Sequence, residues 1–409
     1  MKEFFKVISI EDALGYRTRF ARMQTEVVPL SESLGRILAQ EVRSDIDLPD
    51  FPRSIMDGFA VRGGSTFGAS EGNPVYLMIK GSVAMGEESN LSVGTGEAVR
   101  ISTGGMLPSG ADSVVMVEHT DAIDDTTIEV YRSVAPGQNM VTVGEDIKKG
   151  EAILPAGNSI RPQEAGLLAA LGCQQVTVFR RPVVGIISTG DEVVPIDQVP
   201  GPGQIRDVNT YTLMNQVAQL GAVAVPFGIV GDDYEALLET CIRSQDQCDL
   251  VLVSGGSSVG ARDFTIDIIS AMQDSSLLFH GISISPGKPT LLASVQNKQF
   301  WGLPGHVVSA MVVFSRIVKP FIEYISGYAE SGQNEIRLPA KLSRNLASAQ
   351  GRFDFVRVRL IQKDGVTWAE PILGKSGLIS TMVKADGLIE IGMNTEGIDE
   401  GAEVEVILL

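Results

Sequence analysis

The sequence predicts a multidomain protein of the α/β plus β class, and three observations lead to this prediction. The chain has 409 residues, which at roughly 150 residues per domain corresponds to two or three domains. Hydrophobic residues make up 44% and charged residues 20% of the chain, a composition typical of folded globular proteins. The spacing of apolar residues changes along the chain from helical to β, and later to alternating β and α. These changes divide the sequence into four regions.

The first region has helical patterns and is split in two by an insertion. Ser9-Ile-Glu-Asp12 is typical of a helix start, and the apolar spacing over residues 31–38 predicts a second helix. Pro162–Leu171 has proline at its start and glycine just after its end, which predicts a third helix. We therefore expect residues 1–46 and 145–180 to form one helical domain.

The inserted region, residues 47–144, has a β pattern. Short apolar segments such as Glu97–Ile101, Ser113–Val117 and Thr127–Val130 are separated by Gly, Pro, Asn and Asp, which favour turns. The insertion is therefore predicted to be a small all-β domain.

The third region, residues 181–327, alternates apolar β segments with helical patterns. Val183–Ile187, Leu250–Val253 and Phe300–Leu303 are apolar throughout, as strands of a parallel sheet covered on both faces are. In the last region, residues 328–409, apolar and polar residues alternate, which predicts a terminal β domain.

Charge and cysteine content exclude several classes of function. The chain has 33 Lys and Arg against 50 Asp and Glu, a net charge of −17, so we expect no nucleic-acid partner. The sequence contains neither the apolar core of a signal peptide nor a plausible membrane span, and we expect a cytoplasmic protein. Its three cysteines form no C-x-x-C motif, which argues against a zinc knuckle or a disulfide framework.

Three apolar strands of the third region each lead into a glycine-rich turn: Ser188-Thr-Gly-Asp-Glu192, Ser254–Gly260 and Gly302-Leu-Pro-Gly305. The carboxyl ends of parallel strands meet at one edge of a sheet, where exposed N–H groups favour anions. No P-loop or Rossmann motif is present. The candidate ligand-binding residues of these turns are Ser188, Thr189, Gly190, Ser254, Gly255, Gly256, Ser257, Pro304 and Gly305.

Acidic residues lie close to these turns, which predicts a metal ion between them and a bound phosphate. Magnesium is held by one or two carboxylates together with phosphate oxygens, and Glu192, Asp232 and Asp263 are the candidates. The alternative is that such residues only stabilise helix N-termini. Lys288, in Pro286-Gly-Lys-Pro289, is the candidate cation for an anionic ligand, or else a surface lysine in a turn.

Further motifs occur in order along the chain: Met56-Asp-Gly-Phe-Ala-Val61, Arg100-Ile-Ser-Thr-Gly104 and Gly144-Glu-Asp146. Together with the turns above, they resemble the motif series of the molybdopterin molybdenumtransferase family, which includes the MoeA-type enzymes and the E domain of gephyrin. The resemblance covers nearly the whole chain.

The resemblance implies an enzyme that inserts molybdate into adenylylated molybdopterin and releases AMP, with Mg²⁺ as cofactor. It also implies four domains: a helical linker domain, an inserted β domain, a MoaB/MogA-like α/β domain and a C-terminal β barrel. Family members are elongated homodimers. A molybdopterin adenylyltransferase or a molybdoenzyme apoprotein is a possible partner.

The resemblance further implies a cleft between the α/β domain of one subunit and the inserted β domain of the other. It assigns catalytic roles to Asp57, Asp146, Glu192, Asp263 and Lys288. It assigns substrate binding also to Thr103, Arg352 and Ser376, the last two from the terminal domain.

Two segments depart from the family pattern. Ser285 stands where the family usually has Lys or Arg, and His306-Val307 replaces Asn-Pro. His306 either binds an anion when protonated or only occupies the turn. Two alternatives to the transferase therefore stay open: a variant that prefers tungstate, and a non-catalytic molybdopterin-binding or scaffold protein.

Overall fold

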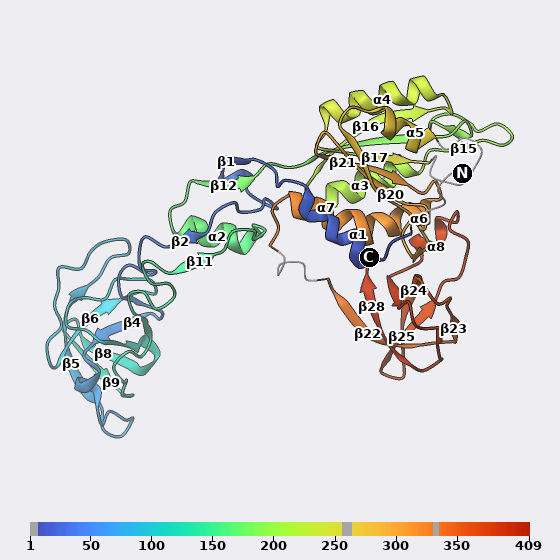
Figure 1. The fold of residues 1–409 in the computed structure, drawn as a ribbon. Helices are drawn as coiled ribbons and strands as arrows, with labels where there is room; N and C mark the ends of the chain where they lie inside the picture. The colour runs from blue at the N-terminus through green and yellow to red at the C-terminus, as the bar shows by residue number, and fades with distance from the viewer. Residues whose placement is uncertain (1–6, 256–263, 330–334) are drawn as a thin grey trace. The chain divides into compact units, whose positions relative to one another are not determined.

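The computed structural model describes residues 7–255, 264–329 and 335–409, and divides the chain into two compact units (Figure 1). The larger unit comprises Met1–Gln40, Ala156–Ala165 and Gln175–Leu409. The smaller unit comprises Glu41–Pro155 and Gly166–Gln174. The smaller unit therefore contains the whole of the predicted insertion.

The smaller unit is built around a six-stranded sheet with the order β7-β4-β6-β5-β9-β8. Alternate residues of its strands point to opposite faces, so that Phe59 and Val61 join one apolar cluster and Ala60 joins another. The strands are β4 (Gly58–Val61), β5 (Val75–Ser82), β6 (Glu97–Ile101), β7 (Ser113–Met116), β8 (Thr120–Asp124) and β9 (Thr127–Val130). Two short pairs flank the sheet: β2 (Val42–Arg43) with β11 (Ala152–Leu154), and β3 (Arg53–Ser54) with β10 (Met140–Val141). The all-β insertion is confirmed.

The predicted N-terminal helices are only partly present. Helix α1 (Ile10–Gly15) begins where expected, because the Ser9 hydroxyl oxygen accepts a hydrogen bond from the Asp12 N–H at 3.0 Å. Helix α2 (Pro162–Ala170) also begins at the predicted proline. The prediction of a second helix over residues 31–38 is wrong, since only the 3₁₀ turn Leu30–Glu32 forms there.

Tertiary pairing explains the missing helix. Gly35 has a φ of +70°, which breaks a helical path. The apolar side chains Ile37 and Leu38 are buried instead by β-bridges to Ser159 and Val178. Beside them, β1 (Thr25–Pro29) pairs with β12 (Gln175–Phe179) in an antiparallel ladder.

The α/β part of the larger unit has a six-stranded sheet with the order β16-β13-β17-β21-β20-β18. The first four strands are parallel, as predicted, and the last two add antiparallel strands that the sequence pattern did not reveal. The strands are β13 (Val183–Thr189), β16 (Val223–Val230), β17 (Leu250–Ser254), β18 (Ser275–His280), β20 (Leu291–Val295) and β21 (Lys298–Leu303).

Helices cover both faces of this sheet (Figure 1). Leu252 packs with residues of α3 (Asn209–Gln219) and α6 (Val307–Val313). Its neighbour Val253 points to the other face and packs with α4 (Tyr234–Gln247) and α5 (Phe264–Ala271). This two-sided burial explains why the strands are apolar throughout.

The C-terminal region is a closed five-stranded barrel, because β24 pairs with both β25 and β26 and so completes the ring β24-β25-β22-β28-β26. A short strand of the α/β part, β19 (Ile284–Ser285), pairs with β24 and joins the two parts. The barrel strands are β22 (Arg337–Leu342), β24 (Phe353–Lys363), β25 (Val366–Pro371), β26 (Gly387–Ile391) and β28 (Glu403–Leu408), and α8 (Ser380–Val383) lies between β25 and β26. Within the described ranges, no helix is both long and apolar enough to cross a membrane.

Candidate functional site

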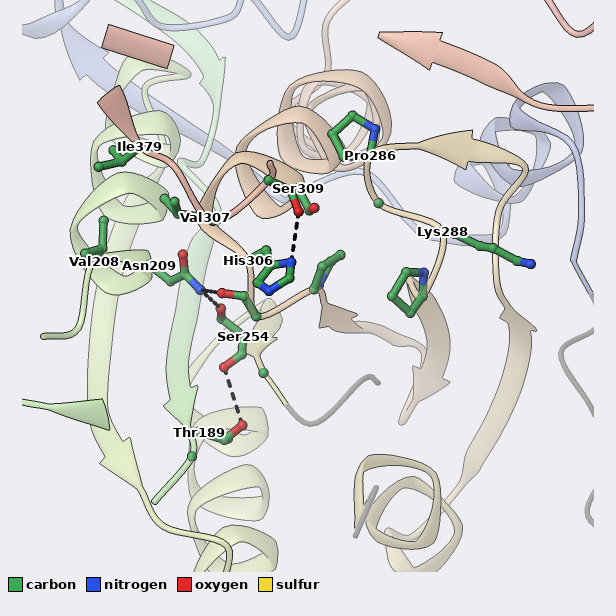
Figure 2. Close-up of a pocket in the computed structure, with 18 of the residues that line it drawn as sticks. Thr189, Val208, Asn209, Ser254, Pro286, Lys288, His306, Val307, Ser309 and Ile379 are labelled. Atoms are coloured by element: carbon green, nitrogen blue, oxygen red, sulfur yellow. Dashed lines mark hydrogen bonds between the residues drawn. The ribbon is translucent and has the colours of Figure 1, made fainter. Parts of the chain in front are cut away.

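A pocket of about 1520 Å³ lies at the carboxyl ends of β13, β17 and β21, as the glycine-rich turns predicted (Figure 2). We call its α/β side the strand-end wall, formed by residues 188–190, 254–255 and 304–305. A second part of its lining, the barrel wall, is formed by residues 349–352, 376, 377 and 379 of the C-terminal region. All lining residues belong to the larger unit.

The strand-end wall is held by internal hydrogen bonds. The Ser188 hydroxyl donates to the Asp207 carboxylate at 2.9 Å and lies 3.0 Å from the Thr210 hydroxyl. The Thr189 hydroxyl donates to the Ser254 carbonyl at 3.4 Å. Gly255, with a φ of +108°, packs so closely that a Cβ there would lie 2.5 Å from the Thr189 hydroxyl oxygen. The wall therefore presents mainly backbone to the pocket.

Asn209, at the start of α3, is a site residue that the sequence analysis missed. Its side-chain N–H₂ donates to the Ser254 hydroxyl at 2.6 Å and to the Gly305 carbonyl at 2.8 Å, and Figure 2 shows these contacts. Asn209 thus joins the ends of β17 and β21. Its place at the first residue of α3, in the same α/β region as the glycine-rich turns, was the available signal.

His306 connects the strand-end wall to the barrel wall. Its Nδ1 lies 2.8 Å from the Ser376 hydroxyl, and the Val308 N–H donates to the Ser376 carbonyl at 3.0 Å. His306 occupies the N-cap position of α6, although its side chain makes no capping hydrogen bond. The contact with Ser376 gives His306 a structural role in this turn. His306 also lines the pocket, so a role in anion binding stays open.

The acidic residues near the pocket divide into two groups. Asp233 caps α4 by accepting a hydrogen bond from the Ala236 N–H at 2.8 Å, and Asp191 accepts one from the Asp232 N–H at 2.8 Å. Glu192 and Asp232 instead line the pocket with exposed side chains. The third metal candidate, Asp263, lies outside the described residues, as do Gly256 and Ser257.

The donor set is compatible with Mg²⁺ shared with a substrate. In the part of the chain that the structure describes, no three His, Cys, Asp or Glu side chains are grouped to hold a metal by themselves. Two carboxylates, Glu192 and Asp232, line one pocket, and Mg²⁺ is commonly bound by one or two carboxylates plus phosphate oxygens.

Cationic side chains also line the pocket. Arg206, Lys288 and Arg352 do so from three different segments. Lys288 is exposed, and in Figure 2 its side chain extends away from Asn209 and His306. The turn that carries it requires Gly287, because a Cβ at this position would lie 2.3 Å from a Val313 methyl group. The pocket therefore offers both negative and positive groups to a ligand.

Comparison with known proteins identifies the family. The chain matches the MoeA N-terminal region (domain I and II) over residues 8–172, a probable molybdopterin binding domain over 185–324 and the MoeA C-terminal region (domain IV) over 339–409. It is 38% identical to a putative molybdopterin biosynthesis protein of Methanocaldococcus jannaschii, with 93% of this chain and 92% of that protein covered. The chain belongs to the MoeA family.

Relatives and solved structures of this family agree with the fold. The MoeA-family chain is 34% identical to the molybdopterin molybdenumtransferase of Haemophilus influenzae over 94% of its length and 93% of that protein. A crystal structure of the molybdopterin biosynthesis MoeA protein from Pyrococcus horikoshii OT3 matches with a TM-score of 0.85 and 32% identity, covering 99% of this chain and all of that one. The predicted family and fold class are confirmed.

Three predicted site residues of this MoeA-family chain lie in the smaller unit. Asp57 and Thr103 are in direct contact, since one Asp57 carboxylate oxygen accepts the Thr103 N–H at 2.8 Å and its hydroxyl at 3.2 Å. Asp146 is exposed. That these residues face the pocket of a second subunit stays a prediction.

Proposed function

We propose that this MoeA-family chain is a molybdopterin molybdenumtransferase that inserts molybdate into adenylylated molybdopterin and releases AMP, using Mg²⁺. Family membership places the chain in molybdenum cofactor biosynthesis. The observation that carries the more specific proposal is the pocket, where Glu192 and Asp232 share one cavity with Lys288 and Arg352. A site that joins two anions needs cations, and a site that also binds Mg²⁺ needs carboxylates.

In this proposal the residues of the pocket have different roles in binding the anions, holding Mg²⁺ and excluding water. The strand-end wall, fixed by Asn209, presents backbone against which a phosphate can pack closely. Lys288 and Arg352 offset the negative charge of molybdate and of the adenylyl phosphate. Glu192 and Asp232 would hold Mg²⁺, which when bound polarises the phosphoanhydride. Closure by Asp57 and Asp146 of a second subunit would exclude water, which strengthens these interactions.

The homodimer in this proposal has its own test. Because each cleft would take Asp57 from one subunit and Lys288 from the other, mixing inactive Asp57→Ala and Lys288→Ala proteins should restore activity in mixed dimers. At random pairing about half of the dimers are mixed, and each mixed dimer has one intact cleft out of two. About a quarter of the wild-type activity is therefore expected. Absence of any recovery in verified mixed dimers contradicts the shared cleft.

Reconstitution of a cofactor-free molybdoenzyme tests the function itself. Purified protein is supplied with adenylylated molybdopterin, Mg²⁺ and either molybdate or tungstate, and the activity of the recipient enzyme is measured. We expect activation with molybdate. Activation with tungstate alone identifies the tungstate variant, and tight binding without activation by either oxyanion identifies the non-catalytic binding protein. The same assay with and without an added molybdopterin adenylyltransferase tests whether that enzyme must deliver the substrate.

A further inference from the structure

Arg352 reaches the pocket from the barrel wall, and a neighbouring carboxylate holds it. Its Nε lies 3.0 Å from Asp354 Oδ1, and its Nη2 lies 3.4 Å from Oδ2. The two residues are two positions apart at the start of β24, where alternate side chains share a face. The Arg352 side chain is 46% exposed, whereas that of Asp354 is only 11% exposed. The carboxylate is therefore a buried anchor for a guanidinium that borders the pocket.

The Asp354 anchor is itself fixed by a hydroxyl group. The Ser348 hydroxyl donates to Oδ2 at 2.6 Å. Burial raises the pKa of the Asp354 carboxyl, but the hydrogen bond from Ser348, the side chain of Ser285 and the charge of Arg352 together hold it below its ordinary value. The group is thus an anion with donors from Ser348 and Arg352 around it.

The same carboxylate connects the barrel to the segment that carries Lys288. Asp354 is the register partner of Ser285 in the β19–β24 pair, and the Phe353 N–H donates to the Ser283 carbonyl at 2.9 Å. Ser285 immediately precedes the Pro286-Gly-Lys-Pro289 turn. Asp354 is therefore placed to hold Arg352 in a constant position relative to Lys288.

We propose that Asp354 is a positioning residue, which orients Arg352 so that the guanidinium N–H groups not facing Asp354 bind a tetrahedral oxyanion in the pocket. This inference rests on the proposed function, in which both molybdate and the phosphates of adenylylated molybdopterin are such anions. Arginine has five N–H donors in a planar fork. Asp354 occupies the Nε edge, which leaves donors on the remaining edge for the ligand.

Orientation and charge predict opposite effects for Asp354→Asn, which makes the substitution informative. The amide has the same shape, but it removes one negative charge near an anion site, so a purely electrostatic role predicts tighter binding. A positioning role predicts weaker binding, because an unanchored arginine loses rotamer freedom when it binds. We expect the loss of orientation to dominate, with a dissociation constant about tenfold higher for the ligand that Arg352 contacts.

The test is a double-mutant cycle in the full-length protein. Equilibrium dialysis measures the dissociation constant for molybdate, and fluorescence titration measures that for adenylylated molybdopterin. The proteins are wild type, Asp354→Asn, Arg352→Ala and the double variant, with Asp386→Asn as the control. Asp386 is a barrel carboxylate that accepts a hydrogen bond from the Leu360 N–H at 2.7 Å and does not line the pocket.

If Asp354 acts through Arg352, both single variants weaken the same ligand, and the double variant binds within about twofold of Arg352→Ala. The ligand affected identifies the anion as molybdate or a phosphoryl group. Wild-type or tighter binding by Asp354→Asn overturns the proposal, as do effects that multiply in the double variant. If Asp354→Asn does not fold, Ser348→Ala decides: it keeps the carboxylate, should weaken binding about threefold, and overturns the proposal if its affinity is unchanged.

These outcomes separate the inference from the proposed function. Wild-type protein that binds both ligands but releases no AMP contradicts the transferase, while the dissociation constants still decide the role of Asp354. Wild-type turnover with unaltered binding by Asp354→Asn contradicts the inference alone.

Discussion

The strand-end wall and the barrel wall line the same pocket, but their side chains differ in burial and in how they are held in place. Ser188, Thr189 and Ser254 of the strand-end wall are buried and hydrogen-bonded to one another or to nearby groups of the α/β part. Arg352 of the barrel wall is exposed and depends on side-chain contacts for its orientation. The first wall should tolerate almost no change of backbone shape, whereas the second should respond to the loss of single polar contacts.

The largest effect is expected for Gly255→Ala in the strand-end wall. The new Cβ would lie 2.5 Å from the Thr189 hydroxyl oxygen and 2.6 Å from its carbonyl oxygen, at a φ of +108°. We expect about 3 kcal/mol of destabilisation and a loss of AMP release of about 100-fold or more, since the wall must move. Denaturant unfolding and initial rates measure both quantities.

Gly365→Ala is the matched control for Gly255→Ala. Gly365 has a φ of +75° in a barrel turn, but nothing lies within 4 Å of an added Cβ. Gly365→Ala should lower the free energy of unfolding by only about 1–2 kcal/mol, because of the backbone conformation. It should leave the rate of AMP release unchanged. Equal rate losses in the two variants would contradict a role for close packing at the strand-end wall.

The next largest effect is expected for the carboxylates of the pocket. Glu192→Gln and Asp232→Asn should each raise the Mg²⁺ concentration needed for half-maximal AMP release by at least about tenfold, because a neutral amide is a poorer ligand for a hard cation. Asp233→Asn is the control, since asparagine also caps helices and Asp233 caps α4. An unchanged Mg²⁺ requirement in both pocket variants excludes them as metal ligands.

A smaller effect is expected when the clasp between β17 and β21 is removed. Asn209→Ala loses the hydrogen bonds to Ser254 and Gly305, which predicts a decrease in kcat/KM of about 10- to 30-fold. Asn215→Ala, on the same helix, removes only a hydrogen bond to the Tyr211 carbonyl and should have wild-type kinetics. Similar losses in both would indicate that α3 is merely destabilised.

The smallest effect concerns Asp354, which holds Arg352 of the barrel wall, and it depends on pH. The pKa of Asp354 is held below its ordinary value, so its ionised form stabilises the folded protein above the unfolded-state pKa of about 3.9. This contribution is lost as the pH falls through the lower folded-state pKa. The Tm difference between wild type and Asp354→Asn should therefore be greatest near neutral pH and shrink in acid. A difference that grows on acidification contradicts this sign.

The contrast between the walls also explains what the sequence could predict. The strand-end wall follows from local patterns, because Ser188-Thr-Gly190 and Gly302-Leu-Pro-Gly305 each combine an apolar strand with a glycine turn. Asn209 was missed because its function depends on contacts with loops 45 and 96 residues away. The Asp354 anchor was missed for the same reason, since Ser285 reaches it through the β19–β24 pair.

The same distinction applies to the fold. The strands β13 and β17 were predictable from their continuous apolar residues, because burial on both faces imposes this composition. The helix expected over residues 31–38 did not form, because bridges from Ile37 and Leu38 bury the same apolar side chains in extended backbone. Local spacing cannot distinguish these two ways of burying a side chain.

The rate of AMP release as a function of molybdate concentration tests the central claim most directly. Wild-type protein is given adenylylated molybdopterin and Mg²⁺, and AMP is measured at increasing molybdate. If the pocket joins the two anions, release requires Mg²⁺, rises with molybdate and reaches a plateau. Release at the same rate without molybdate, or no release at any molybdate concentration, would contradict the claim that this pocket performs molybdenum transfer.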